Sequence, residues 1–173
     1  GGTAESQEPV PAVRNPAAQE DVQEAPLGSD GEAFILCLDG ENVNMTMRDY
    51  LIGTLAAEMP AGFQPEALKA QAVAARTYAM YKIQRGDSAA HPGAPLCGDA
   101  GCCAAYQAPE ALLEKWGAAY YENLRAITGA VDDTAGLCLV FQDAPILAVF
   151  HSSSGGMTES CAAVWGTELP YLV

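Results

Sequence analysis

A single glutamate, Glu58, lies in an apolar stretch of the chain, where its carboxyl group could do acid chemistry. If residues 50–59 form a helix, Leu51, Leu55 and Glu58 share one face at i, i+4 and i+7, where the pattern favours an aliphatic residue. Burial disfavours the charged form of a carboxyl group and keeps a proton available for a leaving-group oxygen. The alternative is that Glu58 faces solvent at a frayed helix end, just before Pro60.

A second group of reactive side chains lies in a loop rich in glycine, proline and cysteine. Four potential metal ligands fall within 13 residues there, namely His91, Cys97, Cys102 and Cys103. Thiolates and an imidazole form a common zinc ligand set. Because Cys102 and Cys103 are adjacent, they cannot easily both reach one tetrahedral ion, so we expect water or an outside residue to complete the site. Disulfide bonds are the alternative, since six cysteines allow fifteen pairings.

A third candidate segment follows the apolar run that ends at Phe150. Residues 151–158 have the sequence His-Ser-Ser-Ser-Gly-Gly-Met-Thr. Small hydroxylated residues and paired glycines let a sugar chain approach the backbone closely, so Ser153, Ser154 and Thr158 are candidate substrate-binding residues. A serine nucleophile is the competing interpretation, but the segment lacks the Gly-x-Ser-x-Gly elbow that such a serine needs in an α/β-hydrolase.

Several separated blocks of the chain match one known family in sequence and in order. The blocks are Glu58-Met-Pro, Glu66-Ala-Leu-Lys-Ala-Gln-Ala-Val-Ala-Ala-Arg-Thr-Tyr78, Phe150-His-Ser-Ser-Ser-Gly-Gly-Met-Thr-Glu159, Val164-Trp-Gly and Pro170-Tyr-Leu. Through them the chain resembles the stage II sporulation protein D family, also known as the amidase-enhancer family. The resemblance covers roughly residues 42–173.

The resemblance implies a catalytic role for Glu58. Characterised members are peptidoglycan lytic transglycosylases of sporulation and cell-wall remodelling. They cleave the bond between N-acetylmuramic acid and N-acetylglucosamine and leave 1,6-anhydromuramic ends. The C6 hydroxyl of muramic acid is the nucleophile, so the enzyme gives and takes one proton, whereas most glycoside hydrolases need two carboxylates. A lone Glu58 fits the first chemistry, although Glu66, Glu110 and Glu159 remain candidates for a second carboxylate.

The resemblance also indicates substrate-binding residues on the helix that follows Glu58. Gln71 and Arg76 belong to the matched block, and we expect Arg76 to bind the lactyl carboxylate of muramic acid or a sugar hydroxyl. A structural ion pair between Arg76 and Glu58 or another acid is the alternative. An arginine beside Glu58 would favour the charged carboxylate and oppose its role as an acid, so we expect the two side chains to be apart.

The cysteine loop matches the family as well. Some members hold zinc through one His and two Cys at a spacing that fits His91, Cys97 and Cys103. We therefore expect a structural zinc ion and no organic cofactor. Two alternatives to an enzyme stay open: a non-catalytic peptidoglycan-binding module that enhances a partner amidase, and a zinc-stapled domain that assembles other cell-wall proteins. Glu58 discriminates between them, because only catalysis requires an acid at this position.

The residue patterns predict an α+β fold built around a central helix rich in alanine. This helix covers residues 65–85, begins at Pro65 and ends before Gly86. Around it the patterns predict two strands, two further helices and a hairpin, at residues 33–38, 43–47, 48–59, 110–127, 137–141 and 146–150. Gly117 is tolerated inside the later helix, and Thr158 is placed to cap a short helix near the end.

Composition divides the chain into a tail and one compact domain. Residues 1–32 hold seven acidic residues against one arginine, four prolines and few large apolar side chains, so they are predicted to be a disordered linker. Residues 33–173 are predicted to form a single domain of the family's kind. The family's domain continues past the Pro170-Tyr-Leu block, so we expect this one to be incomplete at its C-terminus.

The net charge and the hydropathy of the chain limit the kinds of partner it can have. The net charge of −14 argues against a nucleic-acid partner, because phosphate binding needs clustered Lys and Arg. We expect peptidoglycan glycan strands as the partner, and the family's second name adds a cell-wall amidase. No apolar stretch approaches the length of a membrane span. Family members are extracytoplasmic and membrane-anchored, so the resemblance implies an anchor upstream of Gly1.

Overall fold

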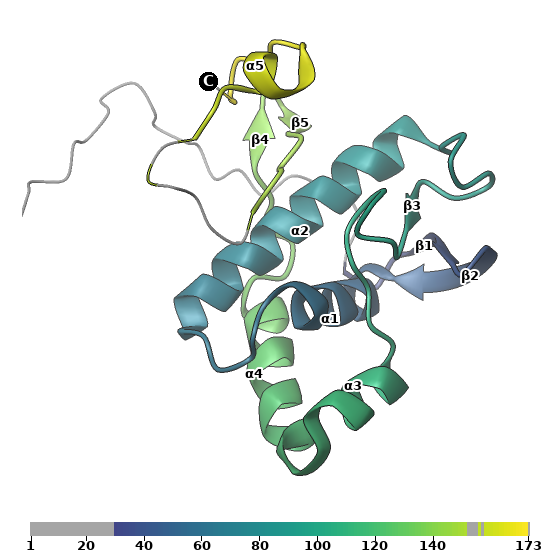
Figure 1. The fold of residues 1–173 in the computed structure, drawn as a ribbon, viewed down its shortest axis with the longest axis vertical. Coiled ribbons are helices and arrows are strands. Elements are labelled where there is room, and N and C mark those ends of the chain that lie inside the picture. Colours follow the sequence, from purple (N-terminus) through teal and green to yellow (C-terminus); the bar gives the residue numbers. More distant parts are fainter. Residues whose placement is uncertain (1–29, 152–155, 157, 173) are drawn as a thin grey trace, which may run out of the picture.

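Helix α2 (Pro65–Arg85) runs across the centre of an α+β fold, with a small sheet at one side of it (Figure 1). The computed structural model describes residues 30–151, 156 and 158–172. Ala72, Ala75 and Ala79 of α2 are fully buried. Their small side chains let the neighbouring helices pack close to the α2 backbone. The central alanine-rich helix is therefore confirmed, with its predicted bounds.

Two strands and one short segment form the sheet. Strands β1 (Ala33–Leu38) and β2 (Glu41–Thr46) are antiparallel and turn at Asp39 and Gly40, which both have positive φ. Strand β3 (Leu96–Cys97) pairs with β1 in parallel, with Cys97 opposite Cys37. This pairing anchors the start of the cysteine loop on the sheet.

Helix α1 (Met47–Glu58) connects the sheet to the candidate acid. It is capped by Thr46, whose hydroxyl accepts a hydrogen bond from the backbone N–H of Asp49 at 3.1 Å. Leu51 and Leu55 are fully buried and pack in the core with α2. The predicted helix at 48–59 is confirmed, and Glu58 is its last residue. Within the described part of the chain, no helix is both long and apolar enough to cross a membrane.

The predicted single helix at 110–127 is wrong, because the segment forms two helices. Helix α3 (Pro109–Trp116) ends at Gly117, which has φ +50°, and a 3-10 turn, η1 (Gly117–Ala119), leads into α4 (Tyr120–Asp133). The left-handed conformation at Gly117 breaks the helix instead of being absorbed into it. Helix α4 also runs past Gly129, and it packs against α1 and α2.

The last described segment contains a hairpin, but the predicted second strand at residues 146–150 is wrong, because the observed strand lies in the predicted turn. Its strands are β4 (Val140–Phe141) and β5 (Ala144–Pro145), joined by Gln142 and Asp143, which have φ values of +51° and +62°. A short helix, α5 (Cys161–Trp165), follows. Its cap is Ser160, whose hydroxyl accepts from the N–H of Ala163 at 3.3 Å, so the prediction of Thr158 as the cap is wrong.

The first described residues belong to the folded domain. The backbone carbonyls of Asp30 and Glu32 accept hydrogen bonds from the N–H groups of Arg48 and Met47 at 2.8 and 3.1 Å. The side chain of Asp30 pairs with Arg76 at 2.8 Å and is only 12% exposed. The predicted domain boundary after residue 32 is therefore too late by at least these residues.

Arg76 has a structural environment. Its side chain is 1% exposed, and its N–H groups donate twice to the carboxylate of Asp30, to the carbonyls of Val131 and Leu137, and to the hydroxyl of Thr134. These five contacts match the five donors of a guanidinium group. The structural ion pair considered for Arg76 is thus the one observed, with Asp30 as the acid, and it joins α2 to α4 and to the start of the domain.

Replacing Arg76 by methionine is expected to destabilise the domain by about 3–5 kcal/mol, because it leaves the Asp30 carboxylate buried without its cation. Urea unfolding followed by circular dichroism measures the loss. Arg48→Met is the matched control, since Arg48 pairs with Asp132 at an exposed surface and should cost less than about 1 kcal/mol. Similar losses for the two variants would contradict the structural role of Arg76.

Candidate active site

Glu58 is the last residue of α1, and it is half-buried. Its exposure is therefore intermediate between the buried carboxyl group and the solvent-facing one that the sequence left open. Its Oε1 accepts a hydrogen bond of 3.0 Å from the backbone N–H of Ala105, in the loop that follows the cysteines. Among the described residues no ion pair reaches Glu58. The expected separation of Glu58 and Arg76 is confirmed to this extent, because the Arg76 guanidinium pairs with Asp30 instead.

A glycine in α1 lets the loop approach Glu58. A Cβ atom at Gly53 would collide with the ring of Tyr106 and would lie 2.7 Å from the carbonyl oxygen of Gln107. The N–H of Gln107 also donates to the Gly53 carbonyl at 3.3 Å. The absence of a side chain at Gly53 therefore allows the loop to lie directly on α1, and this fixes the Ala105 donor against the carboxylate.

Glu58 borders a hollow of about 520 Å³, which we call the larger hollow. Its walls come from the turn after α1, from α2, from the cysteine loop, from residues 148–151 and from α5. The polar and aromatic residues in its lining include Glu58, Phe63, Gln71, Tyr78, Phe150 and Trp165. Phe63 and Trp165 are 51% and 58% exposed, which is unusual for aromatic side chains of this size. A volume in this range with aromatic walls is typical of a small-ligand site.

Two polar side chains of α2 point into the larger hollow. Gln71 and Tyr78 are seven residues apart and so lie on one helix face. The side-chain amide nitrogen of Gln71 is buried and has no hydrogen-bond partner among the described residues. Burial, with the nearby Cys103 thiol as a second cause, raises the pKa of Tyr78, so its hydroxyl stays protonated at neutral pH. Both side chains therefore bring a polar group to the wall of the larger hollow.

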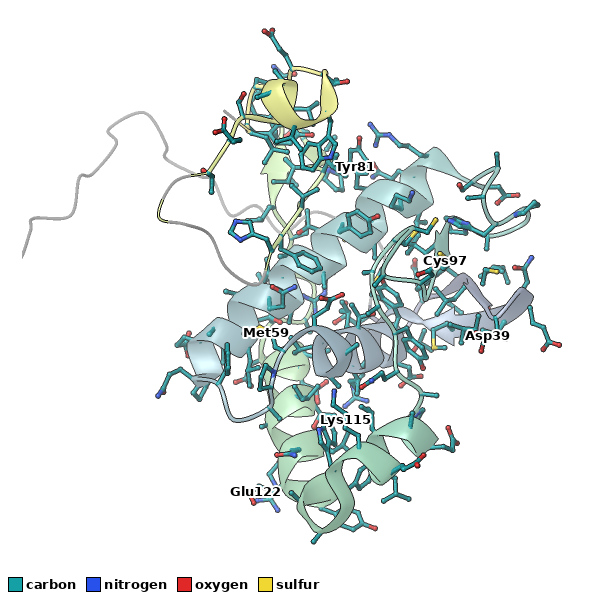
Figure 2. The ribbon with its side chains drawn as sticks, in the orientation of Figure 1. Asp39, Met59, Tyr81, Cys97, Lys115 and Glu122 are labelled. Carbon is teal, nitrogen blue, oxygen red and sulfur yellow. The ribbon has the colours of Figure 1, made fainter. Side chains whose placement is uncertain are left out.

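A second hollow of about 360 Å³ lies on the other side of the same segment, and we call it the smaller hollow. It shares Glu58, Met59 and Pro60 with the larger one and adds Lys115, Trp116 and Asn123. Figure 2 shows Met59 at the end of α1 and Lys115 beneath α1, toward α3 and α4. Glu58 therefore lies where two hollows meet. It is the one carboxylate among the described residues that line them.

The cysteine loop also brings together the ligands of a candidate metal centre. The ligand atoms of His91, Cys97, Cys102 and Cys103 all lie within 4.8 Å of one another. The structure thus brings Cys102 to the cluster, contrary to the expectation that adjacent cysteines cannot both reach it. Four thiolate and imidazole ligands at such spacing fit a tetrahedral zinc ion. None of the six cysteines forms a disulfide bond in the structure.

The histidine of the cluster is held in a ligand orientation. Nδ1 of His91 lies 2.7 Å from the carbonyl oxygen of Ala94, which fixes the proton on that nitrogen. Nε2 then offers its lone pair, and it lies 3.4 Å from Sγ of Cys103. Burial raises the pKa of Cys97 to about 12. Burial opposes ionisation of the Cys103 thiol too, but its contacts with the Cys97 backbone and with the His91 side chain lower its pKa overall.

The candidate metal centre and the candidate acid are adjacent. Cys103 lines the larger hollow, and Ala105, which donates to Glu58, is two residues further along the loop. A metal ion held by the four ligands would fix the loop on one side of Ala105. The hydrogen bond between Gln107 and Gly53 fixes it on the other side.

The structure brings some of the predicted residues together and separates others. Glu58 and Gln71 line the same hollow, whereas Arg76 lines neither hollow. Thr158 is exposed and does not line them either. Ser153 and Ser154 lie outside the described residues. The three candidates for a second carboxylate, Glu66, Glu110 and Glu159, do not line either hollow.

Several residues of the site have weak sequence signals. Tyr78 could have been found from its spacing of seven residues from Gln71 on a predicted helix. Phe63 and Trp165 are aromatic residues in loop-like or helix-end positions, but nothing in their local sequence shows that they face one hollow. The Ala105 donor and Lys115 depend entirely on tertiary contacts.

Comparison with known proteins places the chain in a family. The model of the SpoIID family, described as Stage II sporulation protein, matches residues 41–141. That match covers more than half of the chain and includes α1, α2, the cysteine loop and both helices after it. The chain belongs to the SpoIID family, so the resemblance seen in the sequence blocks is confirmed.

Three relatives illustrate the relationship. Stage II sporulation protein D of Bacillus amyloliquefaciens is 42% identical over 130 residues, which are 75% of this chain and 38% of the relative. The protein of the same name from Bacillus subtilis (strain 168) is 40% identical over 129 residues, again 75% and 38%. The Amidase enhancer of the same strain is 33% identical over 123 residues, which are 71% and 14%. This chain therefore spans well under half of the length of these relatives.

Proposed function

We propose that this protein is a peptidoglycan lytic transglycosylase that uses Glu58 as its single acid and base. The observation that carries the proposal is the position of Glu58, which is the one carboxylate among the described residues that line these two hollows. A glycan strand has to extend on both sides of the bond that is cut. Hollows on both sides of Glu58 suit such a substrate.

The proposed reaction begins with proton transfer from Glu58 to the oxygen of the bond between N-acetylmuramic acid and N-acetylglucosamine. That bond breaks with its electron pair on the protonated oxygen. The C6 hydroxyl of the muramic acid residue forms the new bond to the anomeric carbon, and its proton returns to Glu58. The second proton transfer restores the acid, so no second carboxylate is needed, in contrast to a hydrolase with a carboxylate pair.

The backbone donor at Ala105 supports both steps. Its hydrogen bond to Oε1 holds the carboxyl group in one orientation and leaves Oε2 to exchange the proton with substrate. The same bond stabilises the carboxylate after it has donated. A zinc ion at His91, Cys97, Cys102 and Cys103 would supply structural support for this loop. Proton transfer itself needs only the carboxyl group.

The walls of the larger hollow offer the contacts that a sugar chain needs. The faces of Phe63 and Trp165 can stack on the apolar C–H faces of pyranose rings. The unpartnered amide of Gln71 and the hydroxyl of Tyr78 can bind sugar hydroxyls or acetamido groups. The sequence candidates Ser153, Ser154 and Thr158 remain proposed substrate-binding residues.

The fragments released from purified glycan strands are expected to end in 1,6-anhydromuramic acid, because the nucleophile is a hydroxyl of the substrate. Mass spectrometry identifies this end, since it is one water lighter than a reducing end. Strands incubated without protein are the control. Reducing ends alone would show that water is the nucleophile and would rule out a transglycosylase.

A second function is favoured by one observation, the 33% identity to a protein named Amidase enhancer. In that case the chain would bind peptidoglycan and stimulate a partner amidase without cutting glycan. The third alternative, a zinc-stapled domain that assembles cell-wall proteins, would use the cysteine cluster alone.

We also propose an extracytoplasmic location at the cell wall, with a membrane anchor outside this chain.

A further inference from the structure

The smaller hollow contains a cation in an unusual setting. Nζ of Lys115 donates hydrogen bonds to the backbone carbonyl of Ala56 at 3.1 Å and to the side-chain oxygen of Gln107 at 3.0 Å. Both acceptors are neutral. An ammonium group has three N–H donors, so one donor of Lys115 is not used by these contacts. Figure 2 shows the side chain beneath α1.

Three of the other cations of the described domain are already neutralised, and the remaining ones, Lys82, Arg85 and Arg125, line neither hollow. Three basic side chains form ion pairs with acids, in the pairs Arg48–Asp132, Lys69–Asp133 and Arg76–Asp30. Lys115 has no carboxylate within ion-pair distance among the described residues, apart from sharing a hollow with Glu58. It is therefore a cation held in place by neutral groups, at the edge of a hollow that also borders the candidate acid.

Two neighbours extend this polar wall. Asn123 lines the same hollow, and its side-chain amide makes no hydrogen bond within the part of the chain that the structure describes. Trp116, also in the wall, is half-buried and presents an aromatic surface. A charged donor, an amide and an aromatic surface together are suited to a sugar that carries an acid group.

We propose that the smaller hollow is a binding site for the carboxylate of a muramic acid residue, with Lys115 as its cation. This inference rests on the proposed function, because it takes peptidoglycan glycan as the ligand. Muramic acid differs from glucosamine by a lactyl ether whose carboxylate is negatively charged when no peptide is attached. A chain with a net charge of −14 repels an anion unless a local cation meets it. Lys115 thus has the role that the sequence suggested for Arg76.

The test measures binding, so that it does not depend on cleavage. In a Glu58→Gln background, peptide-free glycan strands and chito-oligosaccharides of similar length are titrated by calorimetry. The chito-oligosaccharides have the same sugar backbone without the lactyl carboxylate. Lys115→Gln is expected to weaken binding of the glycan strands roughly fivefold to tenfold and to leave chito-oligosaccharide binding unchanged. Lys115→Arg should retain most of the affinity.

The matched control is Arg125→Gln, which removes the same charge from an exposed position of α4 outside the hollow. It should leave both affinities unchanged. As a measurement that needs no variant at Lys115, strands whose lactyl carboxylates have been converted to methylamides should bind roughly fivefold to tenfold more weakly than untreated strands. That result keeps the proposal testable if Lys115→Gln fails to fold.

The outcomes separate the subsite from the catalytic proposal. Equal losses for glycan and chito-oligosaccharide would overturn the subsite and leave Lys115 with a structural role. Unchanged binding of the methylamide strands would overturn it as well. If the wild-type chain cuts no glycan but binds it through Lys115, the transglycosylase proposal fails and the subsite stands.

Discussion

Replacement of Glu58 by glutamine is expected to abolish strand cleavage while glycan binding and the fold persist. The loss of a general acid costs about 100- to 10,000-fold in rate. Glutamine has the shape of glutamate, and its amide oxygen can still accept the 3.0 Å hydrogen bond from Ala105. The variant therefore removes the exchangeable proton and little else. Release of soluble fragments from glycan strands, measured by mass spectrometry, reports the rate.

The control for this variant is Glu110→Gln, which removes an exposed carboxylate of α3 that lines neither hollow. It should cut glycan at the wild-type rate. If Glu58→Gln retains more than about a tenth of the wild-type rate, general acid catalysis by Glu58 is excluded. A second carboxylate would then have to be found elsewhere, and the described hollows offer none.

The elements that the sequence predicts well are those whose signals are local. The helix at residues 65–85 has a proline at its first position and a glycine just after its end, and both signals act within a few residues. The antiparallel pair β1 and β2 follows from two extended runs with a tight turn at Asp39 and Gly40. The failure at Gly117 is instructive, because a glycine is compatible with a helix interior or a helix end. Only the packing of α3 against α4 decides between them.

The contacts that the sequence did not predict are those between distant segments. Arg76 and Asp30 are 46 residues apart, and no local pattern pairs them. Once that pair forms, Arg76 is no longer available for a substrate. Lys115 lines a hollow together with Glu58, and its ammonium group donates to the carbonyl of Ala56 near the end of α1, although 59 residues separate the two in sequence. The local sequence does not distinguish the two cations. Only the tertiary structure shows that Arg76 is buried and paired with Asp30, whereas the ammonium group of Lys115 contacts neutral acceptors.

The metal centre shows the opposite case, in which spacing carries most of the information. His91, Cys97, Cys102 and Cys103 stand out as potential ligands within a short loop, because zinc ligands commonly cluster in sequence. The family resemblance pointed to His91, Cys97 and Cys103 only, and Cys102 was not expected to join them because it is adjacent to Cys103. The loop turns tightly here, with the N–H groups of Cys102 and Cys103 both donating to the carbonyl of Asp99 at 3.1 and 2.8 Å. That turn directs both sulfur atoms to the cluster.

Purified protein is expected to contain about one zinc ion per chain, and a strong chelator is expected to lower its melting temperature by roughly 10 °C or more. The unfolded chain has no preformed site, so the free energy of metal binding adds to the free energy of unfolding. For a domain of this size each kcal/mol corresponds to roughly 2–4 °C. Elemental analysis and thermal unfolding with and without chelator measure the two quantities.

Cys97→Ser should lower the melting temperature more than it lowers turnover per folded molecule, because the proposed reaction needs a proton from Glu58 and no Lewis acid. Cys161→Ser is the matched control, since Cys161 is buried outside the cluster and a serine hydroxyl can also donate to the carbonyl of Thr167. That variant should keep its zinc. If the protein contained no zinc and the loop had two fewer free thiols than cysteines, a disulfide bond would take the place of the proposed metal centre. A disulfide bond would then hold the loop, and with it the Ala105 N–H donor, on the same side of Glu58. The catalytic proposal therefore does not depend on whether a metal ion or a disulfide bond fixes the loop.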